Sequence, residues 1–296
     1  MKKHGLFVGL VTLDLIYLAE SPPKHNQKIV AADYTVAAGG PATNAVVTFN
    51  HLGEQGRILG VIGSHPMTQL VRTDLEDYKV AVTDLAPHNN NSLPVSSIIV
   101  TEATGERAVI SINAVKTQVN AQNIPDNILD DVDIVLIDGH QMIVGLHIAE
   151  MAKARSIPVV IDGGSWKTGF EQILPKVDYA ICSGNFYPPN CPDIPQEDTK
   201  SRCQAVSNYL QELNVPHIAI TQGEKPIYYF SQGEAGIIDV PKIKTVDTLG
   251  AGDIFHGAFC HFILREKFTD ALISAANIAS HSCEFFGTRL WMKSSK

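Results

Sequence analysis

The chain has 296 residues, of which 45% are hydrophobic and 18% are charged. This balance is typical of a compact globular protein and excludes a disordered chain. A formal net charge of −8 argues against nucleic acid as a partner, and five cysteines without a CxxC pair argue against a disulfide framework or a zinc site. No segment reaches the roughly 20 apolar residues that span a bilayer, so we expect a cytoplasmic protein without a membrane partner.

Strands and helices alternate along most of the chain. Apolar runs predict buried strands at 6–11, 29–38, 57–62, 134–137, 158–161, 179–182 and 217–221. Helical spacing predicts helices at 42–52, 68–78, 146–154, 203–213, 253–265 and 269–283. Hairpins are predicted from 95–101 with 107–113 and from 227–230 with 237–240.

This alternation predicts an α/β fold with a mostly parallel central sheet and helices on both faces. The early hairpin-like segments do not fit the alternation, and we assign them to a small β-sheet over the edge of the main sheet. This lid comprises segments at about 12–38 and 93–113. Because no repeat or low-complexity linker divides the sequence, residues 1–296 are expected to form a single domain.

The run 247–253 reads Asp-Thr-Leu-Gly-Ala-Gly-Asp and opens a predicted helix with a broad apolar stripe. The first turn of a helix carries free N–H groups and roughly half a positive charge. Glycines at 250 and 252 would let an anion approach those groups closely. We therefore expect Gly250, Ala251 and Gly252 to form an anion hole suited to a phosphoryl group in transfer.

Asp253 lies at the same turn. A lone Asp at a helix start is most often a cap. Beside an anion hole, a carboxylate has a more specific use, because it can take the proton from a hydroxyl that attacks a phosphate. The complete seven-residue run favours this second interpretation, with Asp253 as a general base.

The run matches the D-T-x-G-A-G-D signature of the PfkB/ribokinase family of carbohydrate kinases, and the segment 255–259 resembles the F-x-G-A-F that follows it. The segment 39–44, Gly-Gly-Pro-Ala-Thr-Asn, resembles the family's N-terminal G-G-x-x-x-N element. The resemblance covers nearly the whole chain. It implies a ribokinase-like fold and ATP-dependent, Mg²⁺-assisted phosphorylation of a sugar hydroxyl. Among family members the chain looks most similar to ketohexokinase-like and sulfofructose-kinase-like proteins, which implies a ketose-type substrate.

The resemblance also implies roles for individual residues. It makes Asp253 the catalytic base and residues 250–252 the anion hole. It makes Asp14, Gly39, Gly40 and Asn44 the sugar-binding residues, with the substrate lying against the paired glycines. A polyol needs partners of this kind, because Asp accepts hydrogen bonds and Asn both donates and accepts them. The alternative is that Asp14 is a turn residue and Asn44 merely starts a helix.

Three further segments resemble nucleotide-binding elements of the family. Thr221-Gln222-Gly223 resembles the start of the T-x-G-x-x-G loop, although its final glycine is missing. Asn277 lies in a segment like the adenine-pocket helix. Lys167 ends a segment like D-x-N-x-R, with Lys in place of Arg, and could neutralise ATP phosphates. Each is otherwise a surface residue.

Two features of the family are altered or open. The family's N-x-x-E element, which organises magnesium and phosphate, is expected near 183–188, where the sequence lacks the glutamate. Mg²⁺ is still expected, because ATP carries it on its phosphates. The resemblance also allows K⁺ near the anion hole with Asp247 as a ligand, and a homodimer paired through the lid.

Two alternatives to a sugar kinase stay open, a nucleoside (adenosine-type) kinase of the same family and a non-catalytic sugar or nucleotide sensor. A nucleoside needs an apolar or aromatic clamp, and the lid segments contain only two aromatic residues, Tyr17 and Tyr34. The sensor has no use for a base at Asp253. Arg107 in the lid is either an exposed hairpin residue or a contact for an anionic substrate group. The sequence contains neither a G-x-G-x-x-G turn after the first strand nor a P-loop.

Overall fold

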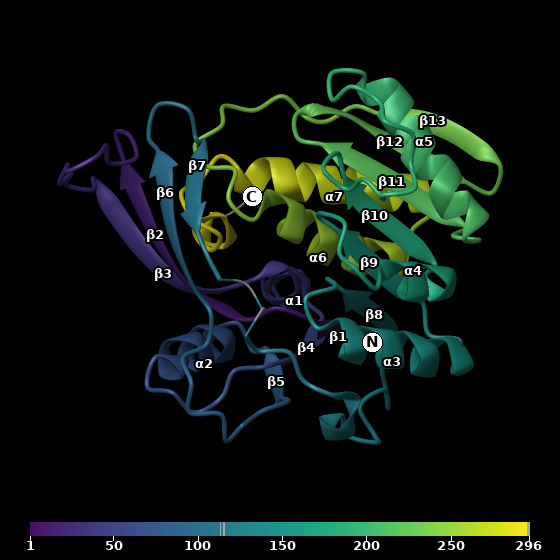
Figure 1. Cartoon of the computed structure of the whole chain (residues 1–296), viewed down its shortest axis with the longest axis horizontal. Helices are drawn as coiled ribbons and strands as arrows, with labels where there is room; N and C mark the ends of the chain where they lie inside the picture. The colour runs from purple at the N-terminus through teal and green to yellow at the C-terminus, as the bar shows by residue number, and fades with distance from the viewer. Residues whose placement is uncertain (113, 115, 295–296) are drawn as a thin grey trace.

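The computed structural model describes residues 1–112, 114 and 116–294. Two separate sheets organise them (Figure 1). The large sheet has nine strands in the order β13-β12-β11-β10-β9-β8-β1-β4-β5. Its strands are β1 (His4–Val8), β4 (Gln55–Gly60), β5 (Ala81–Asp84), β8 (Ile134–Ile137), β9 (Val159–Gly163), β10 (Tyr179–Ser183), β11 (His217–Gln222), β12 (Lys225–Ser231) and β13 (Glu234–Ile238).

In this order, neighbouring strands are parallel from β11 across the sheet to β5. Strands β12 and β13 form an antiparallel hairpin at the other edge, beside β11. The central strand β8 is buried along its whole length, because helices cover both faces of the sheet. In a parallel sheet all carboxyl ends meet at one edge, and the loops that follow them build a common site there.

Helices α1 (Pro41–His51), α2 (Thr68–Asp77), α6 (Ala251–Ile263) and α7 (Phe268–Ser282) share one hydrophobic cluster with the sheet. Helices α3 (Met142–Ala154), α4 (Phe170–Ile173) and α5 (Thr199–Glu212) share a second cluster on the opposite face. Short 3₁₀ helices occur at η1 (Ala121–Asn123), η2 (Leu174–Lys176) and η3 (Leu290–Lys293). Across the described part of the chain, every helix is too short or too polar to cross a membrane.

The small sheet has the order β3-β2-β6-β7, with β2 (Thr12–Ala19), β3 (Asp33–Gly39), β6 (Val95–Thr101) and β7 (Arg107–Ile110). It stands beside the carboxyl-end edge of the large sheet (Figure 1). Its inner cluster of Ile16, Ile98 and Val100 packs on Leu249 and Phe286. The predicted fold class and lid are thus confirmed; position 113, at the end of the expected lid segment, lies outside the described residues.

Several predicted boundaries are wrong. The first strand ends at Val8 rather than at position 11, because the chain turns at Gly9 against Asp138, whose carboxylate accepts a hydrogen bond from the Leu10 amide at 2.8 Å. The strand predicted at 29–38 begins only at Asp33. Strand β5 and helix α4 were not predicted, because runs of four residues carry too little periodicity.

Candidate active site

Helix α6 begins beside the lid, at the glycine turn that the sequence singles out. Gly250 caps the helix with a left-handed φ of 70°, a conformation that favours glycine. The Ala251 amide lies 3.3 Å from the Thr248 carbonyl. Within the described residues, the N–H groups of Gly250, Gly252 and Asp253 donate no hydrogen bond. Of the predicted anion-hole residues, Gly250 and Gly252 therefore keep a free donor and Ala251 does not, while the free N–H of Asp253 was not indicated by the sequence.

The space in front of these donors is open. Gly252 is exposed, and a Cβ added to it would meet nothing within 4 Å. A Cβ on Gly250 would lie 2.8 Å from a Thr288 methyl group and 3.6 Å from Nδ2 of Asn44. The turn is thus packed on the Gly250 side and open on the Gly252 side, where an anion can reach the backbone.

A chain of hydrogen bonds fixes Asp253. Nδ2 of Asn44 donates to Oδ2 of Asp253 at 2.8 Å. The other end of the Asn44 amide, Oδ1, accepts from the Arg289 guanidinium at 2.9 Å. Arg289 also donates to the Ala38 carbonyl at 2.7 Å and to Asp74 at 3.1 Å. Asn44 therefore holds the proposed base, and no sequence pattern pointed to Arg289.

Burial raises the pKa of Asp253 to about 7, and the negative charge of Asp162 adds to the rise. The Asn44 hydrogen bond and the positive charges of His256 and Arg107 act in the opposite direction. A carboxylate with a pKa near the working pH is suited to accept a proton and release it again.

Asp14 lies on β2, and Thr12 at the start of this strand pairs with Gly39 at the end of β3. Its Oδ1 accepts a hydrogen bond of 2.7 Å from the Thr12 hydroxyl. Burial raises its pKa, and hydrogen bonds from Thr12 and Ser96 oppose the rise. A Cβ on Gly39 would lie 1.9 Å from the Asp14 carboxylate, and one on Gly40 would lie 2.3 Å from the Leu10 carbonyl. The glycines are therefore already required by the packing of the protein itself.

The lid hairpin contacts the segment that precedes the glycine turn of α6. The Thr248 hydroxyl donates to the Gly105 carbonyl at 3.2 Å and accepts from the Arg107 guanidinium at 3.0 Å. A Cβ on Gly105, whose φ is +68°, would lie 2.9 Å from the Val246 carbonyl. Arg107, which the sequence favoured as a free surface residue, therefore joins the lid to the glycine turn.

Asp247 is buried just before the glycine turn. Its two carboxylate oxygens accept amide hydrogen bonds of 2.8 Å from Leu249 and Gly287. Burial raises its pKa, and the two amide bonds oppose the rise. The carboxylate thus ties the turn to the segment after α7, while residues 1–112, 114 and 116–294 contain no group of three His, Cys, Asp or Glu side chains that could hold a metal.

The predicted nucleotide residues lie at separate points. Thr221 is the second-to-last residue of β11 and pairs with Ser183 at the end of β10, and the Gly184 amide donates to the Thr221 carbonyl at 2.8 Å. Gly223 forms the following turn with a φ of +64° and open space at its Cβ. Lys167 lies over the Phe170 ring at 5.3 Å, and Asn277 is exposed on α7. No contact among the described residues brings these four to Asp253, so their roles stay predictions.

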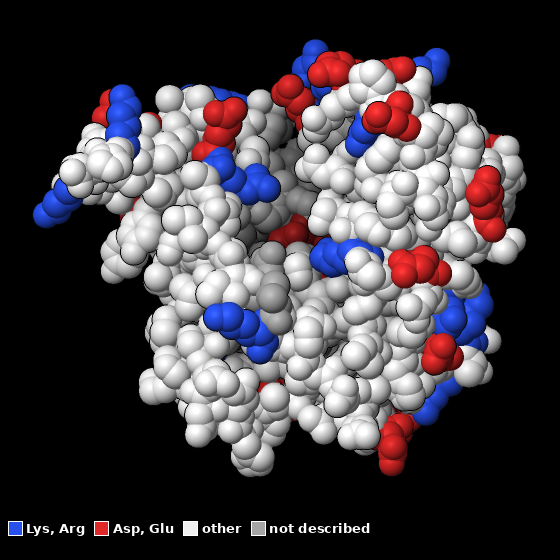
Figure 2. Space-filling model, viewed as in Figure 1, with Lys and Arg blue, Asp and Glu red and all other residues white. Residues whose placement is uncertain are grey.

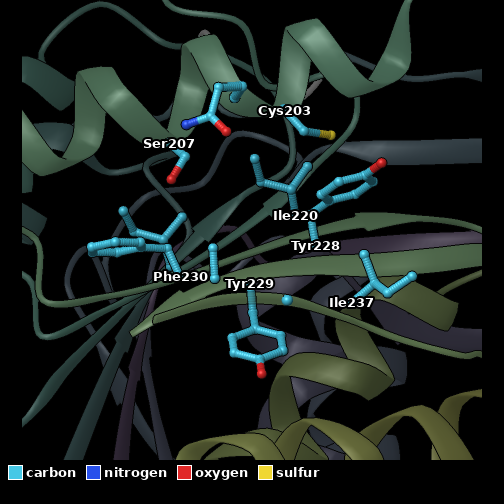
Figure 3. Close-up of a pocket in the computed structure, with 11 residues that line it drawn as sticks. Cys203, Ser207, Ile220, Tyr228, Tyr229, Phe230 and Ile237 are labelled. Atoms are coloured by element: carbon cyan, nitrogen blue, oxygen red, sulfur yellow. The ribbon is translucent and has the colours of Figure 1, made fainter. Parts of the chain in front are cut away.

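Figure 2 shows a hollow between the lid and the large sheet, with acidic atoms at its floor and basic side chains at its rim. Two other hollows contain none of the predicted site residues. One, of about 230 Å³, lies between α5 and strands β11–β13, and Tyr229 points away from it (Figure 3). The other, of about 490 Å³, lies near the amino ends of β1 and β4.

Comparisons with known proteins agree with this geometry. The chain is 25% identical to a ribokinase of Arabidopsis thaliana over 288 residues, covering 93% of this chain and 74% of that protein. It is 23% identical to a deoxyribokinase of Salmonella typhi, covering 91% and 88%. The solved structure of Arabidopsis thaliana ribokinase complexed with ribose and ATP superposes with a TM-score of 0.76 at 22% identity, covering all of both chains. The model of the pfkB family carbohydrate kinases matches residues 2–294, and the chain belongs to that family.

Proposed function

We propose that this protein transfers the γ-phosphoryl group of ATP to a hydroxyl of a small sugar, with Asp253 as the general base. The proposal rests mainly on where the Asp253 carboxylate lies relative to the free N–H groups of the turn. A carboxylate whose pKa is raised to about 7 stands at the same turn as three unbonded N–H groups, those of Gly250, Gly252 and Asp253 itself. A base and an anion hole at one point are what hydroxyl phosphorylation needs.

In this mechanism Asp14 and Asn44 hold hydroxyls of the sugar, which places one of them at Asp253. The carboxylate accepts the proton of that hydroxyl as its oxygen attacks the phosphorus in line with the leaving ADP. The transition state of phosphoryl transfer is loose, so positioning and neutralisation of charge supply most of the rate. The N–H groups at the start of α6 receive the negative charge of the transferred group.

The nucleotide enters as MgATP, the metal arriving on its phosphates. Thr221 and Gly223 are proposed to line its site with Asn277, and Lys167 is proposed to neutralise phosphate charge. The absence of the N-x-x-E glutamate then leaves the metal to the phosphates and water. We also propose a K⁺ ion beside Asp247, because this buried carboxylate organises the turn at the anion hole.

The acceptor is proposed to be a polyol sugar rather than a nucleoside. Tyr17 and Tyr34 pair directly across β2 and β3, so both lie on the same face of the lid. Asp14 is three residues from Tyr17 along β2 and lies on the opposite face. The two lid aromatics therefore do not face the acceptor. The finer prediction of a ketose is kept, while the named relatives make ribose and deoxyribose necessary comparisons.

A homodimer paired through the lid is proposed as well. The lid face that carries Tyr17, Tyr34 and Val36 is exposed, at 39%, 69% and 38% of each residue's surface. Apolar residues gathered on one face of a sheet favour a protein partner, and a second copy of the chain offers the same surface. Sedimentation at micromolar concentration tests this, with Tyr34→Lys expected to give a monomer.

The function is tested by measuring ADP release with ATP, Mg²⁺ and a panel of ketoses, ribose, deoxyribose and adenosine. We expect turnover with at least one sugar and none with adenosine. A folded sample that binds ATP but turns over no sugar would contradict the proposal. Turnover with adenosine alone would replace it with the nucleoside kinase.

A further inference from the structure

His256 lies on α6, one turn after Asp253, and its side chain is 7% exposed. Both ring nitrogens face backbone carbonyls. Nδ1 is 2.7 Å from the carbonyl oxygen of Gly252, and Nε2 is 3.0 Å from that of Ile181 on β10. The ring therefore joins the anion-hole turn of α6 to the central sheet.

A carbonyl oxygen can only accept a hydrogen bond, so each ring nitrogen must donate. A neutral imidazole carries a single N–H, whereas the imidazolium carries two. In either neutral tautomer one nitrogen lone pair would face a carbonyl oxygen in a buried site, where an unmade hydrogen bond is costly. The contacts of both nitrogens are thus satisfied only by the charged form of His256.

A counter-charge is present. Oδ2 of Asp162, at the end of β9, lies 3.6 Å from Nδ1 of His256, and the Asp162 side chain is also 7% exposed. Within the described residues, the side chain of Asp162 makes no hydrogen bond and no other ion pair. A buried carboxylate without a partner is strongly unfavourable, as is a buried lone imidazolium. Each group therefore supplies the charge that the other requires.

We propose that His256 is a positioning residue for catalysis, a lasting imidazolium that pairs with Asp162 and keeps the neighbouring base, Asp253, ionised. The part of this inference that concerns catalysis rests on the proposed function. Asp162 raises the pKa of Asp253, and His256 lowers it. Without the imidazolium, the uncompensated Asp162 would hold a proton on Asp253 at neutral pH and would repel the phosphates of the nucleotide.

The other ionisable groups around this cluster do not replace His256. His140 also interacts with Asp162, but burial lowers the pKa of its ring. Cys182 on β10 and Cys260 on α6 are neutral thiols, because burial and the charge of Asp162 raise the pKa of each. Arg107 approaches from the lid and lowers the pKa of Asp253 less than His256 does. His256 is therefore the main positive charge on the protein side of Asp253.

The charge state can be measured without any assay of activity. In ¹⁵N-histidine-labelled protein at pH 8.5, two-bond ¹H–¹⁵N spectra distinguish a ring with two N–H groups from a neutral ring. His256→Asn assigns the signal by its loss among the eleven histidines, and His256→Gln gives the same assignment if the first variant folds poorly. We expect both nitrogens of His256 to be protonated at this pH. A neutral ring in the folded protein would overturn the proposal, whether or not the chain is a sugar kinase.

The effect on the base is read from the pH dependence of kcat/KM. In His256→Asn the fall of kcat/KM on the acidic side should move up by about one pH unit. At pH 7, kcat/KM should then drop about fivefold, while activity at pH 9 recovers. His261→Asn on the same helix is the control, because His261 contacts Glu54 away from the cleft. It should leave the limb in place. A uniform loss at every pH in His256→Asn would mean a purely structural role and would contradict the inference.

Discussion

Asn44 and Asp253, 209 positions apart in the sequence, meet at 2.8 Å, with the amide of one donating to the carboxylate of the other. Arg289 occupies the opposite end of the Asn44 amide and so determines which end faces Asp253. The proposed base is thus held by a residue that is itself oriented, an arrangement that keeps a catalytic group within a narrow range of positions.

Asn44→Ala removes the only side-chain hydrogen bond to Asp253 found among the described residues. Because that bond lowers the pKa of Asp253, its loss should raise this pKa further. The acidic limb of kcat/KM should move up by about one pH unit, with about a fivefold loss at pH 7. Asn208→Ala on the surface of α5 is the control. An unshifted limb would show that Asn44 does not act on the base.

Arg289→Gln should destabilise the fold and weaken sugar binding. Arg289 and Asp74 are 11% and 16% exposed, and breaking a buried pair by removing one partner costs roughly 3 kcal/mol or more. Arg155→Gln breaks an exposed pair with Asp130, which should cost less than about 1 kcal/mol. Urea unfolding compares the two variants. Equal losses in the free energy of unfolding would mean that the buried contacts of Arg289 do not stabilise the fold.

Gly105→Ala tests the docking of the lid. The change forces an alanine into a positive φ and places its Cβ 2.9 Å from the Val246 carbonyl. Gly233→Ala also alters a hairpin tip at positive φ, but its Cβ meets nothing within 4 Å. Gly233→Ala should lose about 1 kcal/mol of stability because of its positive φ, and Gly105→Ala should lose more, because its Cβ also meets the Val246 carbonyl. Only Gly105→Ala should lower kcat/KM, by about tenfold or more, because the lid no longer closes over the site. Equal kcat/KM in the two variants would mean that docking of the lid is not needed for catalysis.

Gly252→Ala tests the anion hole. Because the residue is helical and its Cβ would lie in open space, the variant should be as stable as the wild type or up to about 1 kcal/mol more stable. The methyl group occupies the proposed phosphate position, so kcat should fall by about 10²-fold. Gly257→Ala, whose Cβ would lie 2.2 Å from the Ala45 carbonyl, should instead lose stability. Full activity in Gly252→Ala would place the phosphate elsewhere.

Much of the fold could be predicted from the sequence, because long apolar runs and helical spacing report burial directly. The strand at 134–137 and the first strand of the lid hairpin, 95–101, were predicted with the bounds that the structure gives. The failures fall where the chain leaves regular structure for a side-chain contact, as at Gly9 beside Asp138. No local pattern reports a partner 129 residues away.

The site followed the same rule. The glycine turn and Asp253 are contiguous, so their sequence carried the prediction. Arg289 contacts Asn44, 245 positions earlier in the chain, and has no local signal. His256 could have been noticed as a polar residue on the buried stripe of α6, since such residues need buried partners.

The central claim, that Asp253 is the base and titrates near neutrality, is tested most directly by kcat/KM between pH 5 and 9. In the wild type we predict a tenfold fall per pH unit below about 7, because the carboxylate must be deprotonated and burial and Asp162 raise its pKa to that value. In Asp253→Asn, kcat/KM should be about 10²- to 10⁴-fold lower than in the wild type and should not fall with pH in this range. It should also be at least as stable at pH 8, since ionising a group with a raised pKa opposes folding as pH rises from about 4 to 7. A limb that persists in Asp253→Asn, or activity within tenfold of the wild type, would contradict the account.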